Sequence, residues 1–148
     1  MQTTLNREEK KQFVMCWVIF IMNGMLALSI GSLLPFIRDA RGLDYTFCGM
    51  LVSLHSVGNL VASFASGALP MAIGRKKSIL LFEAFFPLSY LTLLLSGNSL
   101  FLALAFFATG LARGATSNYC NAKINDIATG KAWALNSLHA MFATGAFL

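Results

Sequence analysis

Long apolar runs separated by short polar segments are the main pattern of this chain. A helix needs about 20 predominantly apolar residues to cross a bilayer. Four runs approach or exceed this length, at residues 13–37, 45–73, 78–95 and 99–120, and a fifth at residues 133–148 is still apolar at the last residue. The pattern therefore predicts an all-α membrane protein, a helical bundle with four complete transmembrane helices and part of a fifth.

The composition agrees with a protein that lies in the membrane. Hydrophobic residues make up 57% of the 148 residues and charged residues only 11%, whereas a typical soluble domain carries about 25% charged residues. The first run follows Lys10 and Lys11, as in a signal peptide, but it is too long for that role and further spans follow it. We therefore expect it to be a permanent span, with the lipid bilayer as the protein's first partner.

Basic residues predict the orientation, because membrane proteins carry an excess of Lys and Arg on the cytoplasmic side. With a cytoplasmic N-terminus, only Arg38 and Arg41 lie outside, and the residues inside are Arg7, Lys10, Lys11, Arg75, Lys76, Lys77, Lys123 and Lys131. The sequence thus predicts a multi-pass protein of the plasma (inner) membrane with a cytoplasmic tail at residues 1–12. Because this anchoring accounts for the net charge of +5, we expect no binding to nucleic acid.

Glu83 and Arg113 are the two charged residues inside the predicted spans. Ionised side chains are costly in a bilayer and by default indicate a functional site. A rise of about 1.5 Å per residue places both at about 21 Å from the outer surface, which predicts an intramembrane charge pair. Two alternatives stay open: Glu83 is a protonated, neutral acid, or Arg113 faces a cavity and binds an anionic or hydroxyl-rich solute.

Polar residues recur at helical spacing along two spans, which places them on one helical face each. The second span carries His55, Asn59, Ser63 and Ser66 in this way. The fourth span carries Gly110 and Gly114, a Gly-x-x-x-Gly pattern that lets another helix approach closely. Such stripes are typical of helix packing as well as of binding surfaces.

Amide and imidazole groups offer both donors and acceptors, as the binding of a polar solute requires. Together with the intramembrane arginine, they give our candidate residues for a substrate cavity. These are Asn23, His55, Asn59, Arg113, Asn118, Asn121 and His139.

Residues 67–77 read Gly-Ala-Leu-Pro-Met-Ala-Ile-Gly-Arg-Lys-Lys and form the expected cytoplasmic loop between the second and third spans. We expect Gly74 to adopt the positive φ that ends a helix. The segment resembles the signature loop of the major facilitator superfamily, and the matching residues are Gly67, Leu69, Gly74, Arg75 and Lys76. Met71 stands where the family has an acidic residue, so Asp126, past the fourth span, is the candidate partner for Arg75.

A second resemblance lies further along the chain, in Gly110-Leu-Ala-Arg-Gly-Ala-Thr-Ser-Asn118, Asn121, Asn125-Asp126, Leu135-Asn-Ser-Leu-His139 and Gly145-Ala146. It is similar to the fucose/galactose/glucose symporter branch of that superfamily. The resemblance implies a facilitator-type bundle in which residues 13–148 are the incomplete N-terminal six-helix half of a transporter. Ser117 stands where this branch has an acid, so the chain has no acidic group for proton coupling at this position.

The resemblance also implies a function: secondary active transport of a small polar solute, with a sugar and proton coupling favoured, by alternating access. The last run has no polar flank after it, so we expect a missing C-terminal half that transport needs. Two other functions stay open, drug-type efflux and a truncated, non-transporting membrane scaffold or accessory protein. The sequence holds no nucleophile–base pattern, and Cys16, Cys48 and Cys120 lack metal-ligand spacing, so we expect no enzyme activity, no metal and no cofactor.

Overall fold

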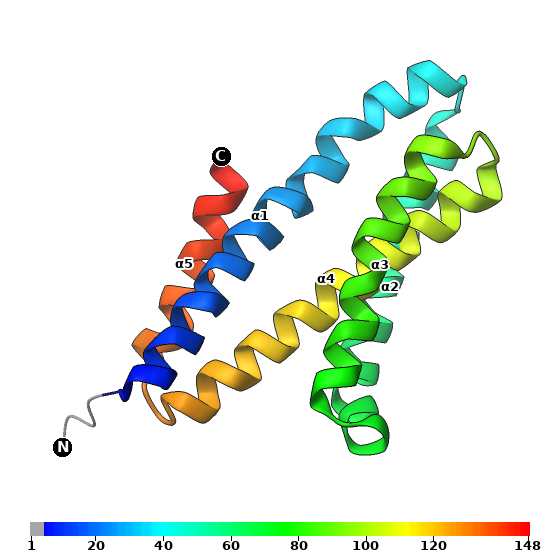
Figure 1. The fold of residues 1–148 in the computed structure, drawn as a ribbon. Helices are drawn as coiled ribbons and strands as arrows, with labels where there is room; N and C mark the ends of the chain where they lie inside the picture. Colours follow the sequence, from blue (N-terminus) through cyan, green and yellow to red (C-terminus); the bar gives the residue numbers. More distant parts are fainter. Residues whose placement is uncertain (1–4) are drawn as a thin grey trace. The chain divides into compact units, whose positions relative to one another are not determined.

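The computed structural model describes residues 5–148, which form five helices joined by short turns (Figure 1). The helices are α1 (Arg7–Arg41), α2 (Tyr45–Ile73), α3 (Arg75–Leu95), α4 (Ser99–Ile127) and α5 (Ala132–Phe147). Within the described residues there is no strand, and four helices are long and apolar enough to cross a membrane. The predicted all-α membrane fold is therefore confirmed. Residues 1–4 of the predicted tail lie outside the described part, and the tail is helical from Arg7 onward.

Helices α1, α3 and α4 extend beyond the apolar runs that predicted them, whereas α2 has the predicted bounds. Helix α1 begins in the polar tail, where the Asn6 side chain accepts a hydrogen bond from the Glu9 amide and the Glu9 side chain accepts one from the Asn6 amide, both at 2.8 Å. This capping box satisfies two amide groups that a helix start leaves unpaired. Helix α4 likewise continues past Cys120 to Ile127. Hydropathy marks the apolar stretch, whereas the helix ends only where a cap or a glycine stops it.

The connection between α2 and α3 is shorter than the sequence predicts. Residues 67–73 belong to α2, and Arg75 already begins α3, so the expected loop is reduced to Gly74 alone. Gly74 has φ +84°, and its amide donates to the Pro70 carbonyl at 3.0 Å. The predicted positive φ at Gly74 is confirmed, whereas the predicted extent of the loop is wrong, because one glycine is enough to reverse the chain.

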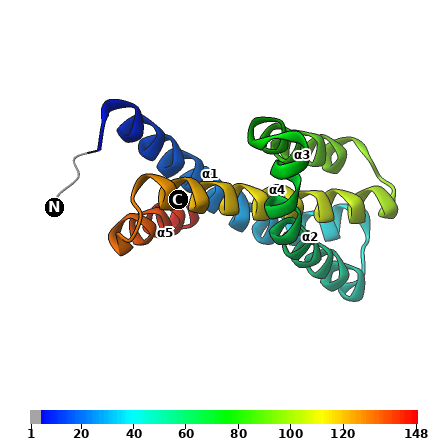
Figure 2. The same cartoon turned by 90° about the horizontal axis from the view of Figure 1, so that it is seen from below.

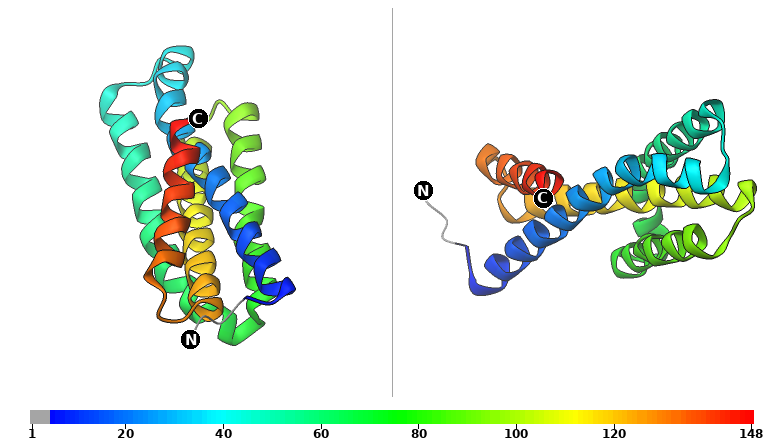
Figure 3. Two further views of the ribbon diagram at one scale, coloured as in Figure 1. Left: turned by 90° about the vertical axis from the view of Figure 1, so that its left-hand side faces the viewer. Right: turned by 90° about the horizontal axis from the view of Figure 1, so that it is seen from above.

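The chain divides into two compact units. In the first, residues 7–30 of α1 pack with residues 119–148, which comprise the end of α4 and the whole of α5. Its core contains Phe13, Phe20, Ile124 and Leu138. Figure 3 shows the turn that connects α4 to α5 in this unit.

Helices α1 and α5 touch through glycines. A Cβ added at Gly24 would overlap the carbonyl oxygen of Phe142, and one added at Gly145 would overlap that of Ile21. Gly24 and Gly145 are therefore positions of close approach between the two helices. Two glycines facing each other's helix let the backbones come closer than side chains would allow.

The second unit comprises residues 31–118, and in it α2 and α3 both pack on α4 (Figure 2). The outward surfaces of α2 and α3 are apolar; Phe64 is 75% exposed and Leu94 79% exposed. Exposed apolar side chains of this size are expected where lipid surrounds the protein. Several polar groups of this unit instead lie where the helices meet.

Candidate functional site

The candidate site lies where α2 crosses α4, at a contact made by glycines. Gly110 lies against the carbonyl oxygen of His55, and Gly58 lies against that of Phe107, so that a Cβ at either position would overlap the oxygen. At Gly114, an added Cβ would lie 2.7 Å from the Asn59 carbonyl oxygen. The predicted role of Gly110 and Gly114 in close helix packing is confirmed. The short separation brings polar side chains of α2 within reach of α4.

Two side-chain hydrogen bonds cross the same contact. The His55 ring nitrogen Nδ1 lies 3.1 Å from the Thr109 hydroxyl oxygen, and the Asn118 amide donates to the Ser66 hydroxyl at 2.9 Å. Two residues of the polar face predicted on the second span, His55 and Ser66, therefore contact α4. These bonds also orient the His55 ring, because one of its two nitrogens has a fixed partner.

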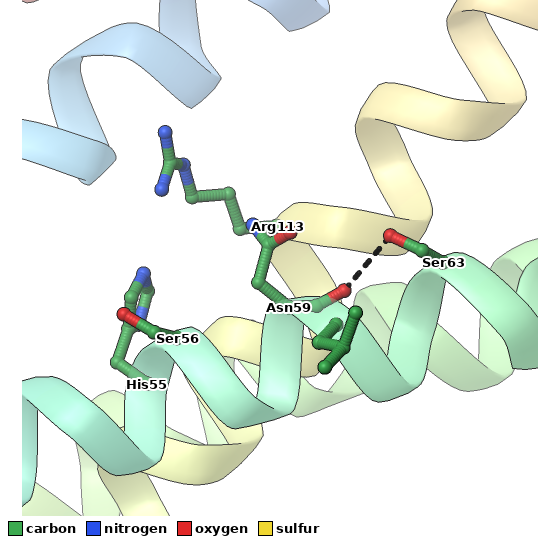
Figure 4. A pocket seen from close by; sticks show the side chains of 6 residues that line it. His55, Ser56, Asn59, Ser63 and Arg113 are labelled. Atoms are coloured by element: carbon green, nitrogen blue, oxygen red, sulfur yellow. Dashed lines mark hydrogen bonds between the residues drawn. The ribbon is translucent and has the colours of Figure 1, made fainter.

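An open pocket of about 380 Å³ lies against this crossing and is lined by His55, Ser56, Asn59, Leu60, Ser63 and Arg113. Five of the lining residues come from α2, and Arg113 comes from α4. In Figure 4, His55, Asn59 and Arg113 point to the same side of α2. Three of the candidate cavity residues, His55, Asn59 and Arg113, are thus brought together. A polar pocket of this size between membrane helices has room for a small solute.

The hydroxyl groups in the pocket are oriented by their own helix. Ser63 donates to the Asn59 carbonyl and Ser56 to the Val52 carbonyl, each at 3.1 Å. Their oxygens therefore meet a solute as acceptors. The Asn59 carboxamide, by contrast, makes no hydrogen bond within residues 5–148 and keeps both its donors and its acceptor.

Glu83 lies on α3, half-buried, and its carboxyl group accepts a hydrogen bond from the Thr116 hydroxyl of α4. Thr116 is three residues further along α4 than Arg113, and Glu83 is not among the residues that line the pocket. The Thr116 oxygen also lies 2.8 Å from the Ala112 carbonyl, so its single proton is shared between two acceptors. The intramembrane charge pair of Glu83 with Arg113 stays a prediction.

The other candidate cavity residues, Asn23, Asn121 and His139, belong to the first unit. Asn23 is buried beside Gly24 in α1. The carboxamide oxygen of Asn121 is buried and accepts no hydrogen bond within the described residues. His139 is exposed and lies edge-on to Phe20, with 6.0 Å between the ring centres. Their role in binding solute stays a prediction.

The signature residues are divided between three helices. Gly67 and Leu69 lie inside α2, Arg75 and Lys76 are exposed in the first turn of α3, and Asp126 is exposed near the end of α4. The pairing of Arg75 with Asp126 stays a prediction.

Sequence analysis missed two residues that organise the site, Thr109 and Thr116. Both are buried, being only 1% and 3% exposed, and each also donates to a carbonyl of its own helix. A threonine in an apolar helix commonly makes this local bond, so the sequence carries no signal for the partner across the helix contact. Only the placement of α2 and α3 against α4 reveals it.

Residues 9–148 match the sequence profile of the sugar (and other) transporter family. The chain belongs to this family. The match confirms the predicted membership of the major facilitator superfamily and a protein of transporter type, not an enzyme. The pocket described above therefore lies in a multi-pass integral membrane protein of a solute-transporting family.

One relative of this transporter family is a gallate transporter from Pseudomonas putida, 28% identical over 107 residues. The aligned region covers 72% of this chain and 24% of the relative, so the chain spans about a quarter of that protein's length. No solved structure matches the chain. The narrower resemblance to the fucose/galactose/glucose branch stays a prediction.

Proposed function

We propose that this chain forms part of a secondary active transporter that moves a small polar solute, a sugar or a sugar derivative, by alternating access with proton coupling. The observation that carries the proposal is the polar pocket at the α2–α4 crossing, which gathers imidazole, carboxamide and guanidinium groups in a member of the sugar (and other) transporter family. Such groups match the donors and acceptors of a hydroxylated solute.

The polarity of the pocket favours this function over drug-type efflux. Five of its six lining residues are polar, and Leu60 is the exception. Drug-like compounds need mainly apolar and aromatic contacts. The name of the gallate transporter points the same way, because gallate is a small, hydroxylated molecule.

Alternating access rocks two helical halves about a shared site near the middle of the membrane. We therefore also propose that the transporter has a second helical half in addition to residues 13–148. We propose further that it lies in the plasma membrane with its N-terminus in the cytoplasm. The 148-residue chain alone in proteoliposomes is then expected not to concentrate a sugar. Concentrative uptake by the chain alone would contradict the need for a second half and would show that the chain transports solute by itself.

The test is uptake of radiolabelled solutes by cells that express the natural reading frame encoding this chain, against cells without it. We expect concentrative uptake of a sugar or sugar derivative that a protonophore abolishes. Asn59→Ala is expected to lower uptake about tenfold, since loss of one or two hydrogen bonds has about this effect. Ser53→Ala is the matched control, because Ser53 lies on α2 outside the pocket and bonds only to the Gly49 carbonyl. Equal uptake by the two variants would remove the pocket from the transport path, and export of apolar dyes in place of uptake would favour efflux.

A further inference from the structure

The charge in the pocket narrows the class of solute, and this inference rests on the proposed transport function. Arg113 supplies a fixed positive charge, and none of the six lining residues is acidic. A guanidinium is planar and binds a carboxylate through two parallel hydrogen bonds. Arg113 is half-buried on a helix that can span the membrane, and charge–charge attraction is stronger there than in bulk water. This end of the pocket therefore fits an anionic group.

The ring of His55 presents an acceptor to the same space. The Thr109 hydroxyl donates its proton to the Phe106 carbonyl at 2.7 Å. This bond assigns the acceptor role in the 3.1 Å contact with His55 to the Thr109 oxygen, and the ring proton to Nδ1. In a neutral imidazole the other nitrogen, Nε2, then carries a lone pair and no proton. A solute meets it best with a hydroxyl group.

The remaining polar groups repeat this preference. Ser56 and Ser63 use their protons on backbone carbonyls, so their oxygens accept. The Asn59 carboxamide lies between them in sequence and offers two donors and one acceptor. One cationic group beside several acceptors is complementary to a molecule with one carboxylate and several hydroxyl groups. A neutral sugar supplies the hydroxyl groups but no carboxylate.

We propose that the pocket of α2 and α4 binds a hydroxycarboxylate, such as a sugar acid, with its carboxylate on Arg113 and its hydroxyl groups on His55 Nε2 and Asn59. The volume of about 380 Å³ lies in the range of small-molecule sites, about 300–1,000 Å³. The open side of the pocket leaves the solute free to contact further helices of the transporter.

The experiment measures binding of D-gluconate, D-glucuronate and D-glucose to the purified product of the natural reading frame, by calorimetry in detergent. We expect both sugar acids to bind at least about tenfold more tightly than glucose, because the bidentate ion pair is lost with the neutral sugar. Arg113→Gln should abolish this preference, because glutamine cannot form the bidentate ion pair with a carboxylate. Arg38→Gln removes a partly exposed arginine that pairs with Asp39 outside the pocket, and should leave the preference intact.

A second measurement uses the wild-type protein, so that its result does not depend on whether the Arg113 variant folds. Phenylglyoxal modifies arginine, and mass spectrometry reports the modified positions. Gluconate should protect Arg113 and glucose should not. Equal affinity for gluconate and glucose, no binding of either sugar acid, or no protection of Arg113 by gluconate would each overturn the proposal.

The uptake assay separates this proposal from the proposed function. Proton-driven glucose uptake that gluconate does not compete with would overturn the hydroxycarboxylate site and leave the transport function intact. Gluconate binding with protection of Arg113, but with no solute transported by expressing cells, would support the site and contradict the transport function.

Discussion

The hydroxyl group of Thr116 donates a hydrogen bond to the carboxyl group of Glu83 and thereby joins α4 to α3. Thr116 is buried and Glu83 half-buried, and both belong to helices that can span the membrane. A polar group that loses its partner in such surroundings incurs a large desolvation cost.

Thr116→Val should therefore destabilise the protein. The valine keeps the shape of the side chain but leaves the Glu83 carboxyl group without the hydroxyl, at a cost of about 1–3 kcal/mol. The measurement is thermal unfolding in detergent. Thr92→Val is the matched control, because Thr92 bonds only to the Leu88 carbonyl of its own helix. Equal melting temperatures for the two valine variants would show that the Thr116–Glu83 bond has no role in stability.

Gly110→Ala should disrupt the packing of α2 on α4. The added methyl group would overlap the His55 carbonyl oxygen, which is rigid backbone and cannot turn away. Overpacking at such a site costs about 1–3 kcal/mol or more. We expect a lower melting temperature and a broadened profile in size-exclusion chromatography. Gly49→Ala, at a helical position of α2 with open space around it, should be neutral or slightly stabilising. A Gly110→Ala protein as stable as Gly49→Ala would contradict the close crossing.

Arg41 holds the end of α1 against the end of α3. Its guanidinium donates to the carbonyl oxygens of Leu93 and Ser96, where α3 ends. Carbonyl groups in the last turn of a helix lack partners in the helix and carry partial negative charge. Removing a charged donor from them costs about 1.5–3 kcal/mol.

Arg41→Ala is thus expected to unfold at a lower temperature than Arg38→Ala. Arg38 pairs with its exposed neighbour Asp39 at 2.5 Å and lies 4.6 Å from the centre of the Tyr45 ring. Exposed contacts of this kind contribute about 1 kcal/mol or less. Thermal unfolding of both variants in the same detergent tests the difference. The reverse order of stability would show that Arg41 does not cap α3.

Cys16 and Cys120 are neighbouring free thiols in the core of the first unit, with a side-chain hydrogen bond between them. Thiols already in contact need little backbone movement to form a disulfide. Treatment with copper phenanthroline should therefore link them within one molecule. Maleimide labelling after denaturation should then reach only Cys48 of the three cysteines. Cys16→Ser should abolish the loss of label, and unchanged labelling of the oxidised wild-type protein would contradict the contact.

Sequence alone predicted the helices well and their ends less well. Membrane hydropathy is summed over about 20 residues and depends little on which helix packs where, so all five apolar runs correspond to helices. The ends of the helices depend on single caps such as the Asn6–Glu9 pair and on one glycine, Gly74. Those local bonds are weak signals beside a long apolar run.

The candidate site was predicted as a set of residues and not as an arrangement. Helical periodicity placed His55 and Asn59 on one face, because residues four apart lie above one another on a helix. It carried no information on which face of α4 would meet them. That choice depends on Gly58, Gly110 and Gly114, whose missing side chains let two backbones touch.

What the sequence by itself determined is therefore the membrane fold, the family and the types of polar group available for a solute. The fold and the polar groups follow from composition and spacing along one chain, and the family follows from the resemblance of its motifs. Only the tertiary structure decided that Glu83 meets Thr116, that Arg41 binds the end of α3, and that His55, Asn59 and Arg113 share one pocket. These pairings join residues far apart in the chain, and they depend on how helices cross, which is set by the shapes of the packed surfaces and not by the periodicity of any one helix.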